Sequence, residues 1–203
     1  MPASFIQALA LDLGNVLVQV DHLRFCRRLA ALAGLGPEEV YLRIFQSELE
    51  PAYDTGRLTS EGFHQRLLEV FPVTLPFPVF SAWWNDIFSP MPEMEETVRK
   101  LAEHYPLYLA SNTNPLHFTY IQERYAFLEV FQDFILSYEV GSRKPEPAFY
   151  QALIKRLGLP PSRCLFVDDK PAFVAAAQAH GLKAWQFTSP TAFTEMLQRH
   201  GWW

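Results

Sequence analysis

Cysteine is scarce in this sequence, which has only Cys26 and Cys164 among 203 residues. Two cysteines so far apart cannot form a disulfide framework or a cysteine-rich zinc site. Both lie in apolar runs, so we expect them to be reduced residues of the core. Disulfide-stabilised modules and cysteine-rich zinc modules are therefore excluded.

Positive charge is also in deficit, because 17 lysine and arginine residues stand against 22 aspartate and glutamate residues, for a formal net charge of −5. General nucleic-acid-binding proteins present a basic excess, so we expect no nucleic-acid partner. No run approaches the roughly 20 apolar residues of a membrane span, and the run at 5–11 is short and stopped by Asp12. We expect a cytoplasmic protein with no membrane span and read 5–11 as a buried strand rather than a signal peptide.

Apolar residues are abundant, since 49% of the chain is hydrophobic and 15% is aromatic. This composition excludes a disordered or low-complexity protein. A chain of this length buries roughly 70% of its unfolded surface when it folds. It is therefore long enough for one domain that carries a modest insertion.

Short apolar runs that end in polar residues alternate with helical patterns along most of the chain. Continuous apolar runs without alternation are typical of strands covered on both faces, as in a parallel sheet. The order strand, helix, strand, helix predicts an α/β fold. The strand candidates are 8–12, 107–112 and 164–169, with weaker ones at 134–137 and 184–187, and the helix candidates are 92–104, 146–157 and 172–180.

The stretch from about 21 to 88 breaks this alternation. Successive amphipathic helix patterns occupy it with no convincing strand between them, and glycines punctuate the turns. We interpret it as a helical insertion after the first strand, so that 1–18 and 90–203 form the core and 19–89 a cap. The predicted helices are 22–33, 37–45, 60–71 and 77–88.

Polar groups follow the three best strand candidates, and ligands bind at the carboxyl ends of strands in open parallel sheets. Carboxylates from two strands need a compensating cation, because like charges a few Å apart raise each other's pKa. A hard ion such as Mg²⁺ takes oxygen ligands and phosphate oxygens. Hydroxyl and amide donors together with a lysine suit a phosphate group. The groups concerned are Asp12, Ser111, Asn112, Lys144, Asp168 and Asp169.

Four stretches in this order resemble the haloacid dehalogenase superfamily of hydrolases: 12–17, 111–114, 143–146 and 166–169. The resemblance implies a Rossmann-like core with a helical cap inserted after the first strand, and dependence on Mg²⁺. More narrowly, DLGNVL, SNTNPLH and the segment 54–63 resemble the sugar-phosphatase branch typified by bacterial α-D-glucose-1-phosphate phosphatase.

Roles carried over by position imply covalent catalysis at Asp12, which would attack phosphorus and form an aspartyl-phosphate. Ser111 and the backbone amide of Asn112 would hold phosphoryl oxygens. Lys144 would neutralise charge on the phosphoryl group and on Asp12. We therefore expect a phosphatase acting on a small phosphorylated metabolite, such as a sugar phosphate like glucose 1-phosphate.

The implied metal ligands are Asp12, the backbone carbonyl of Gly14, and Asp169. Asp168 would ligate Mg²⁺ or act on it through a water molecule. Gly14 departs from most phosphatases of the superfamily, which carry there an aspartate that acts as general acid and base. Losing a placed general acid costs about 10² to 10⁴ in rate. The sugar-phosphatase branch shares this glycine, but Phe173 departs from the asparagine that the branch often has.

Two other functions stay open on the sequence. A haloacid dehalogenase uses the same nucleophile on carbon without metal, although the Asp168–Asp169 pair would repel its carboxylate substrate. A catalytically silent binding module would also account for Gly14 and Phe173. Some positions are equally open: Tyr53, Asp54 and Arg57 face either the site or solvent, and His117 is either packed or at the pocket mouth.

Overall fold

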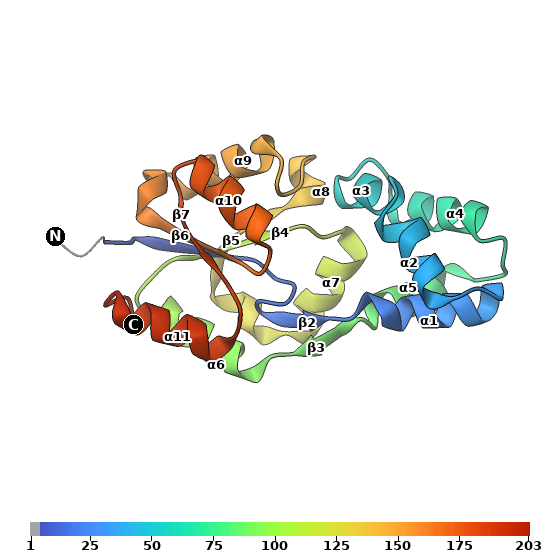
Figure 1. Ribbon diagram of the computed structural model, residues 1–203, viewed down its shortest axis with the longest axis horizontal. Helices are drawn as coiled ribbons and strands as arrows, with labels where there is room; N and C mark the ends of the chain where they lie inside the picture. Colours follow the sequence, from blue (N-terminus) through green and yellow to red (C-terminus); the bar gives the residue numbers. More distant parts are fainter. Residues whose placement is uncertain (1–4) are drawn as a thin grey trace.

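The computed structural model describes residues 5–203. Its centre is a sheet of five parallel strands in the order β5-β4-β1-β6-β7 (Figure 1). The chain runs outward from β1 through β4 to β5, then returns to the other side of β1 for β6 and β7. Ligands bind at such a reversal in strand order. The predicted α/β fold with a parallel sheet is confirmed. The strands are β1 (Ala8–Leu11), β4 (Leu107–Ser111), β5 (Phe131–Leu136), β6 (Cys164–Asp168) and β7 (Lys183–Gln186).

Both faces of the sheet are covered by helices, which explains why the strands are continuously apolar. Leu9 and Leu11 of β1 pack on one side with residues of α6, α7 and α11, whereas Ala8 and Ala10 pack on the other side with residues of α9 and α10. Figure 1 shows the two helical layers above and below the sheet. The helices are α6 (Pro92–Ala102), α7 (Pro115–Arg124), α8 (Ser137–Val140), α9 (Pro147–Leu157), α10 (Pro171–Ala179) and α11 (Pro190–Arg199), with short 3₁₀ turns at Ala126–Val130 and Pro161–Arg163.

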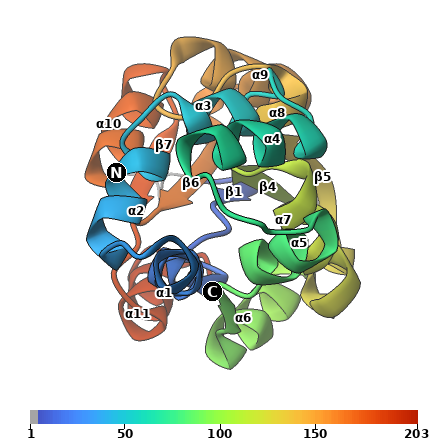
Figure 2. The ribbon, with the colours of Figure 1, turned by 90° about the vertical axis from the view of Figure 1, so that its right-hand side faces the viewer.

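Five helices form a third hydrophobic cluster beyond the carboxyl ends of the strands (Figures 1 and 2). Its centre is aromatic, with Phe25, Phe63, Phe80 and Trp84 in contact. The helices predicted at 22–33 and 37–45 have these ends in the structure, whereas the short helix at 49–54 was not predicted. The five are α1 (His22–Ala33), α2 (Pro37–Phe45), α3 (Leu49–Asp54), α4 (Ser60–Val70) and α5 (Phe77–Asn85).

The expectation that 21–88 holds no strand is wrong at its end. The last helix stops at Asn85, and Phe88 begins β3 (Phe88–Pro90), which pairs antiparallel with β2 (Val18–Val20). Three-residue strands are too short to show an alternating pattern. This ribbon carries the chain between the sheet and the helical cluster in both directions (Figure 1).

Three further observations complete the description of the fold. Cys26 and Cys164 are free and buried. Trp202 is buried in the hydrophobic core that includes α6 and α11. Across 5–203, no helix has the length and apolar character that crossing a membrane requires.

Candidate active site

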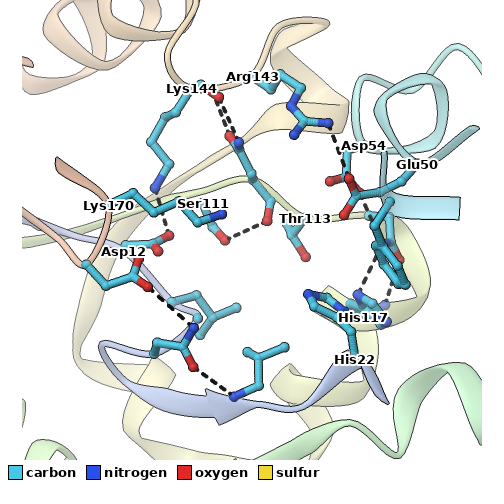
Figure 3. Close-up of a pocket in the computed structure, with 18 of the residues that line it drawn as sticks. Asp12, His22, Glu50, Asp54, Ser111, Thr113, His117, Arg143, Lys144 and Lys170 are labelled. Carbon is cyan, nitrogen blue, oxygen red and sulfur yellow. Dashed lines mark hydrogen bonds and ion pairs between the residues drawn. The ribbon is translucent and has the colours of Figure 1, made fainter. Parts of the chain in front are cut away.

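Three neighbouring strands place two aspartates and a serine at one edge of the sheet. Asp12 directly follows β1, Ser111 ends β4 and Asp168 ends β6. Because β4 and β6 flank β1 in a parallel sheet, their carboxyl ends lie side by side. Asp12 and Ser111 line one cavity with Gly14, Asn112, Lys144 and Asp169 (Figure 3). Asp168 is fully buried close to Asp12 and Asp169. The structure therefore brings together all seven residues singled out in the sequence.

Lys144 is the buried centre of the site, with no exposed surface. Its Nζ donates to Asp12 Oδ1 at 2.7 Å, to Asp168 Oδ2 at 2.6 Å and to the Ala110 carbonyl at 2.7 Å. An ammonium group has three donors, so all three are used. Lys144 thus holds the Asp12 carboxylate in one orientation.

Asn112 positions Lys144 through its side chain. The Asn112 amide donates to the Lys144 carbonyl at 2.9 Å and accepts from the Lys144 backbone N–H at 2.8 Å. These paired bonds tie the loop after β4 to the loop before α9. The sequence pointed to the backbone amide of Asn112 and gave no signal for this side-chain role.

The site has an excess of negative charge. Carboxylate oxygens of Asp12, Asp168 and Asp169 all lie within 4.8 Å of one another, and Lys144 is the cation hydrogen-bonded among them. Burial raises the pKa of Asp12 to about 7, against the opposing effect of Lys144. Burial acts to lower the pKa of Lys144, but Asp12 and Asp168 outweigh it and raise that pKa. The cluster therefore favours uptake of protons or of a further cation.

The donor set fits Mg²⁺. Asp169 Oδ1 is buried without a hydrogen-bond partner among the described residues, and burial, followed by the nearby Asp168, raises the pKa of Asp169. Asp168 has both oxygens engaged, one by Lys144 and one by the backbone N–H of Lys170 at 2.9 Å. An unpartnered carboxylate oxygen in an all-oxygen, negatively charged cluster suits a hard divalent cation. Asp169 is thus better placed than Asp168 to ligate it.

The loop after Asp12 is held by Asn15, which adopts φ +57°. Its side chain accepts from the Val20 backbone N–H at 3.1 Å and donates to Asp169 Oδ2 at 3.4 Å. At Gly14, an added Cβ would lie 3.2 Å from Val20 Cγ2, so a larger residue there requires Val20 to shift.

The end of β4 and the loop that follows it both line the cavity. Ser111 and Thr113 both line the cavity (Figure 3). The residue that caps α7 is Asn114, which accepts from the His117 backbone N–H at 3.1 Å. Ser111 and Asn112 therefore do not cap this helix.

The helical cluster supplies the opposite wall of the cavity, including His22, Glu50 and Asp54. Of the positions left open by the sequence, Asp54 lines the cavity, Tyr53 is buried in the aromatic cluster, and Arg57 lies on the surface. His117 is both packed and part of the lining. The sequence singled out neither His22, at the start of α1, nor Glu50, in the six-residue α3, since no local pattern marks the side of a helix that meets a cavity.

A family model of haloacid dehalogenase-like hydrolases matches residues 6–181. The chain belongs to this family. It is thus a haloacid dehalogenase-like hydrolase, as the four stretches in the sequence predicted.

Relatives of this hydrolase include a D-ribitol-5-phosphate phosphatase of Bacteroides thetaiotaomicron, 24% identical over 89% of this chain and 91% of that one. A crystal structure of a haloacid dehalogenase family enzyme from the same organism has a TM-score of 0.83, with 26% identity over 91% of this chain and 94% of that chain. Another, described as a complex with magnesium and inorganic phosphate, has a TM-score of 0.80 and 25% identity over 90% and 94% of the two chains.

Proposed function

We propose that this hydrolase is a Mg²⁺-dependent phosphatase that cleaves a small phosphomonoester through an aspartyl-phosphate on Asp12. The main observation behind the proposal is the cluster in which Lys144 donates a hydrogen bond to Asp12 while one oxygen of Asp169 has no partner among residues 5–203. A relative named as a phosphatase and a similar structure described with magnesium and phosphate support the same reaction.

In the proposed first step, an Asp12 carboxylate oxygen bonds to phosphorus, the bond from phosphorus to the alcohol oxygen breaks, and that oxygen takes up a proton from water in the cavity. In the second, water attacks the aspartyl-phosphate, which releases inorganic phosphate and restores Asp12. Ser111 and the backbone amide of Asn112 hold phosphoryl oxygens. Lys144 orients Asp12 and offsets charge as it develops.

Residues Asp12 and Asp169, with the Gly14 carbonyl, would hold Mg²⁺, and Asp168 acts mainly through Lys144. When bound, the cation supplies the positive charge that the carboxylates and a phosphate dianion together require. The segment 19–89 serves as the cap that closes the site from the far side.

The cavity favours a small substrate. Its volume is about 210 Å³, below the roughly 300–1,000 Å³ of pockets for drug-sized ligands. A sugar or polyol phosphate, such as glucose 1-phosphate, therefore suits it better than a flavin nucleotide, although some relatives are named as FMN hydrolases. For a sugar 1-phosphate the leaving group is also less basic than an ordinary alkoxide, which reduces the cost of Gly14.

The test is phosphate release from para-nitrophenyl phosphate and a panel of sugar phosphates, with and without Mg²⁺. We expect Mg²⁺-dependent release that Asp12→Asn abolishes. The matched control is Asp133→Asn, which changes a partly exposed carboxylate of β5 that pairs with Arg156 away from the cavity. Halide release from 2-haloacids without metal would instead establish a dehalogenase. If neither phosphate nor halide is released, the protein is instead a catalytically silent binding module.

A further inference from the structure

Asp54 is a buried carboxylate that the proposed chemistry does not use. It ends α3 in the helical cluster, is 5% exposed and lines the same cavity as Asp12. Figure 3 shows it across the cavity from Asp12. A substrate whose phosphate lay at Asp12 would extend its alcohol part toward this wall.

The two oxygens of Asp54 differ in their contacts. Oδ1 accepts a hydrogen bond from the Asn114 side-chain amide at 3.2 Å. Oδ2 accepts no hydrogen bond from residues 5–203 and is not among their fully buried unpartnered atoms, so it is open to the cavity that Asp54 lines. A donor group on a bound ligand can reach it there, and a ligand that covered it without a donor would leave it unpaired.

A rigid hydrogen-bond network holds Asp54 in this position. Burial lowers the pKa of His117 to about 3, so its ring is neutral. Its Nε2 lies 3.0 Å from the Trp84 carbonyl and must donate to it, which leaves Nδ1 to accept from the Asn114 amide at 3.1 Å. The Asn114 oxygen accepts from the His117 backbone and from Trp84 Nε1 at 3.4 Å. The amide of Asn114 is therefore oriented with its nitrogen toward Asp54.

The surroundings of Asp54 favour a neutral donor over a charged one. Glu50 lies on the same helix and raises the pKa of Asp54, which burial chiefly raises to about 7. Arg143 and Lys170 oppose that effect, and Arg143 Nη1 lies 3.5 Å from Glu50. Arg143 already stands as a cation beside these carboxylates, and an added anion would meet two negative groups.

We propose that Asp54 is a specificity-determining residue that accepts a hydrogen bond from a hydroxyl group on the alcohol part of the substrate. This inference rests on the proposed phosphatase function and narrows its substrate class to phosphate esters of polyhydroxy alcohols. A site built to accept from a hydroxyl group discriminates strongly against an analogue that lacks it, because the buried acceptor is then left unpaired.

The test compares two esters with the same carbon chain, ribitol 5-phosphate and pentyl phosphate, in the wild-type protein, Asp54→Asn and Asp54→Ala. We expect the wild type to favour the ribitol ester by roughly 10- to 100-fold in kcat/KM, as a hydrogen bond to a charged group allows. Both variants should lose most of that preference through a raised KM. Activity on pentyl phosphate and para-nitrophenyl phosphate should change less than threefold.

Asp86→Ala is the matched control, because Asp86 is an exposed carboxylate at the end of α5 that pairs with Arg28. It should keep the ribitol preference. Equal losses on all three esters, with a lower thermal midpoint, would show that Asp54 is only structural and overturn the inference. So would a wild type that does not prefer the ribitol ester.

Failure of the phosphatase proposal gives a different result. If no ester is hydrolysed with Mg²⁺, calorimetric binding of the same two esters still tests Asp54. Tighter binding of ribitol 5-phosphate that Asp54→Ala removes would support the subsite without catalysis, and equal binding would overturn it.

Discussion

Replacing Lys144 by methionine is the sharpest test of how the site is held together. The change keeps most of the side-chain volume and removes the ammonium group that donates to Asp12, Asp168 and the Ala110 carbonyl. All three acceptors would then be left in a buried place without their donor. We expect catalysis to be lost and the fold to be weakened.

The size of the loss follows from the burial of these groups. Removing one partner of a buried ion pair costs about 3–5 kcal/mol, out of a total stability of about 5–15 kcal/mol for a typical domain. Burial already raises the pKa of Asp12 to about 7, above its usual value near 4. A carboxyl group with a raised folded pKa stabilises the protein at low pH and loses that contribution as pH rises. Without the lysine this pKa rises further, so the deficit of the variant should be smallest near pH 5 and largest near pH 8.

The assay is urea unfolding at pH 5 and pH 8 without metal, on the wild type, Lys144→Met and the double variant Lys144→Met/Asp168→Asn. The double variant should recover part of the stability at pH 8, because it carries one buried negative charge fewer. A loss below about 1 kcal/mol at pH 8, or an equal loss at both pH values, would refute the view that Lys144 compensates buried carboxylates.

Three further predictions concern pH, a close contact and the metal. Burial lowers the pKa of His117 in the folded protein to about 3, against 6.5 in the unfolded chain. The free energy of unfolding should therefore fall below pH 6.5, by as much as about 1.4 kcal/mol per pH unit. Urea unfolding between pH 4 and 7 should show a shallower fall for His117→Gln than for the wild type. Gly56→Ala should lower the free energy of unfolding more than Gly158→Ala does, by a difference of more than about 1 kcal/mol. Both glycines have a positive φ, but only at Gly56 would an added Cβ meet backbone, 2.5 Å from the Tyr138 carbonyl oxygen. Equal losses of stability in thermal unfolding would contradict this. Chelation of Mg²⁺ should abolish phosphatase activity and lower the thermal midpoint, and Asp169→Asn should remove the midpoint shift; a shift that persists in Asp169→Asn would place the metal elsewhere.

Elements with local stop signals were predictable, and those that depend on tertiary contact were not. The ends of α1 follow from Asp21, whose side chain accepts from the Leu23 backbone N–H, and from Gly34 in the left-handed conformation. By contrast α3 has six residues and β2 and β3 have three each. Isolated segments of this length are not stable on their own, so packing decides their structure.

The same division applies to the site. Asp12, Ser111 and Asp168 could be placed together because parallel strands end at one edge, whatever the helices do. The opposite wall could not be placed, because the orientation of α3 depends on its contact with α8, where Gly56 lies against Tyr138. The pairing of the Asn112 side chain with Lys144 also spans two loops that no local pattern connects.

The charges of the site distinguish a phosphatase from a dehalogenase. Three carboxylates lie around one hydrogen-bonded lysine, and one of them, Asp169, keeps a buried oxygen without a partner among residues 5–203. A haloacid would bring a carboxylate into this field with no cation of its own, and the repulsion would weaken its binding. A phosphate ester that arrives where Mg²⁺ is held meets a site whose negative charge the metal has already offset. The residue that argues most strongly for phosphoryl transfer is thus Asp169, because its charge impedes the competing reaction and its unpartnered oxygen would ligate the Mg²⁺ that the proposed one requires.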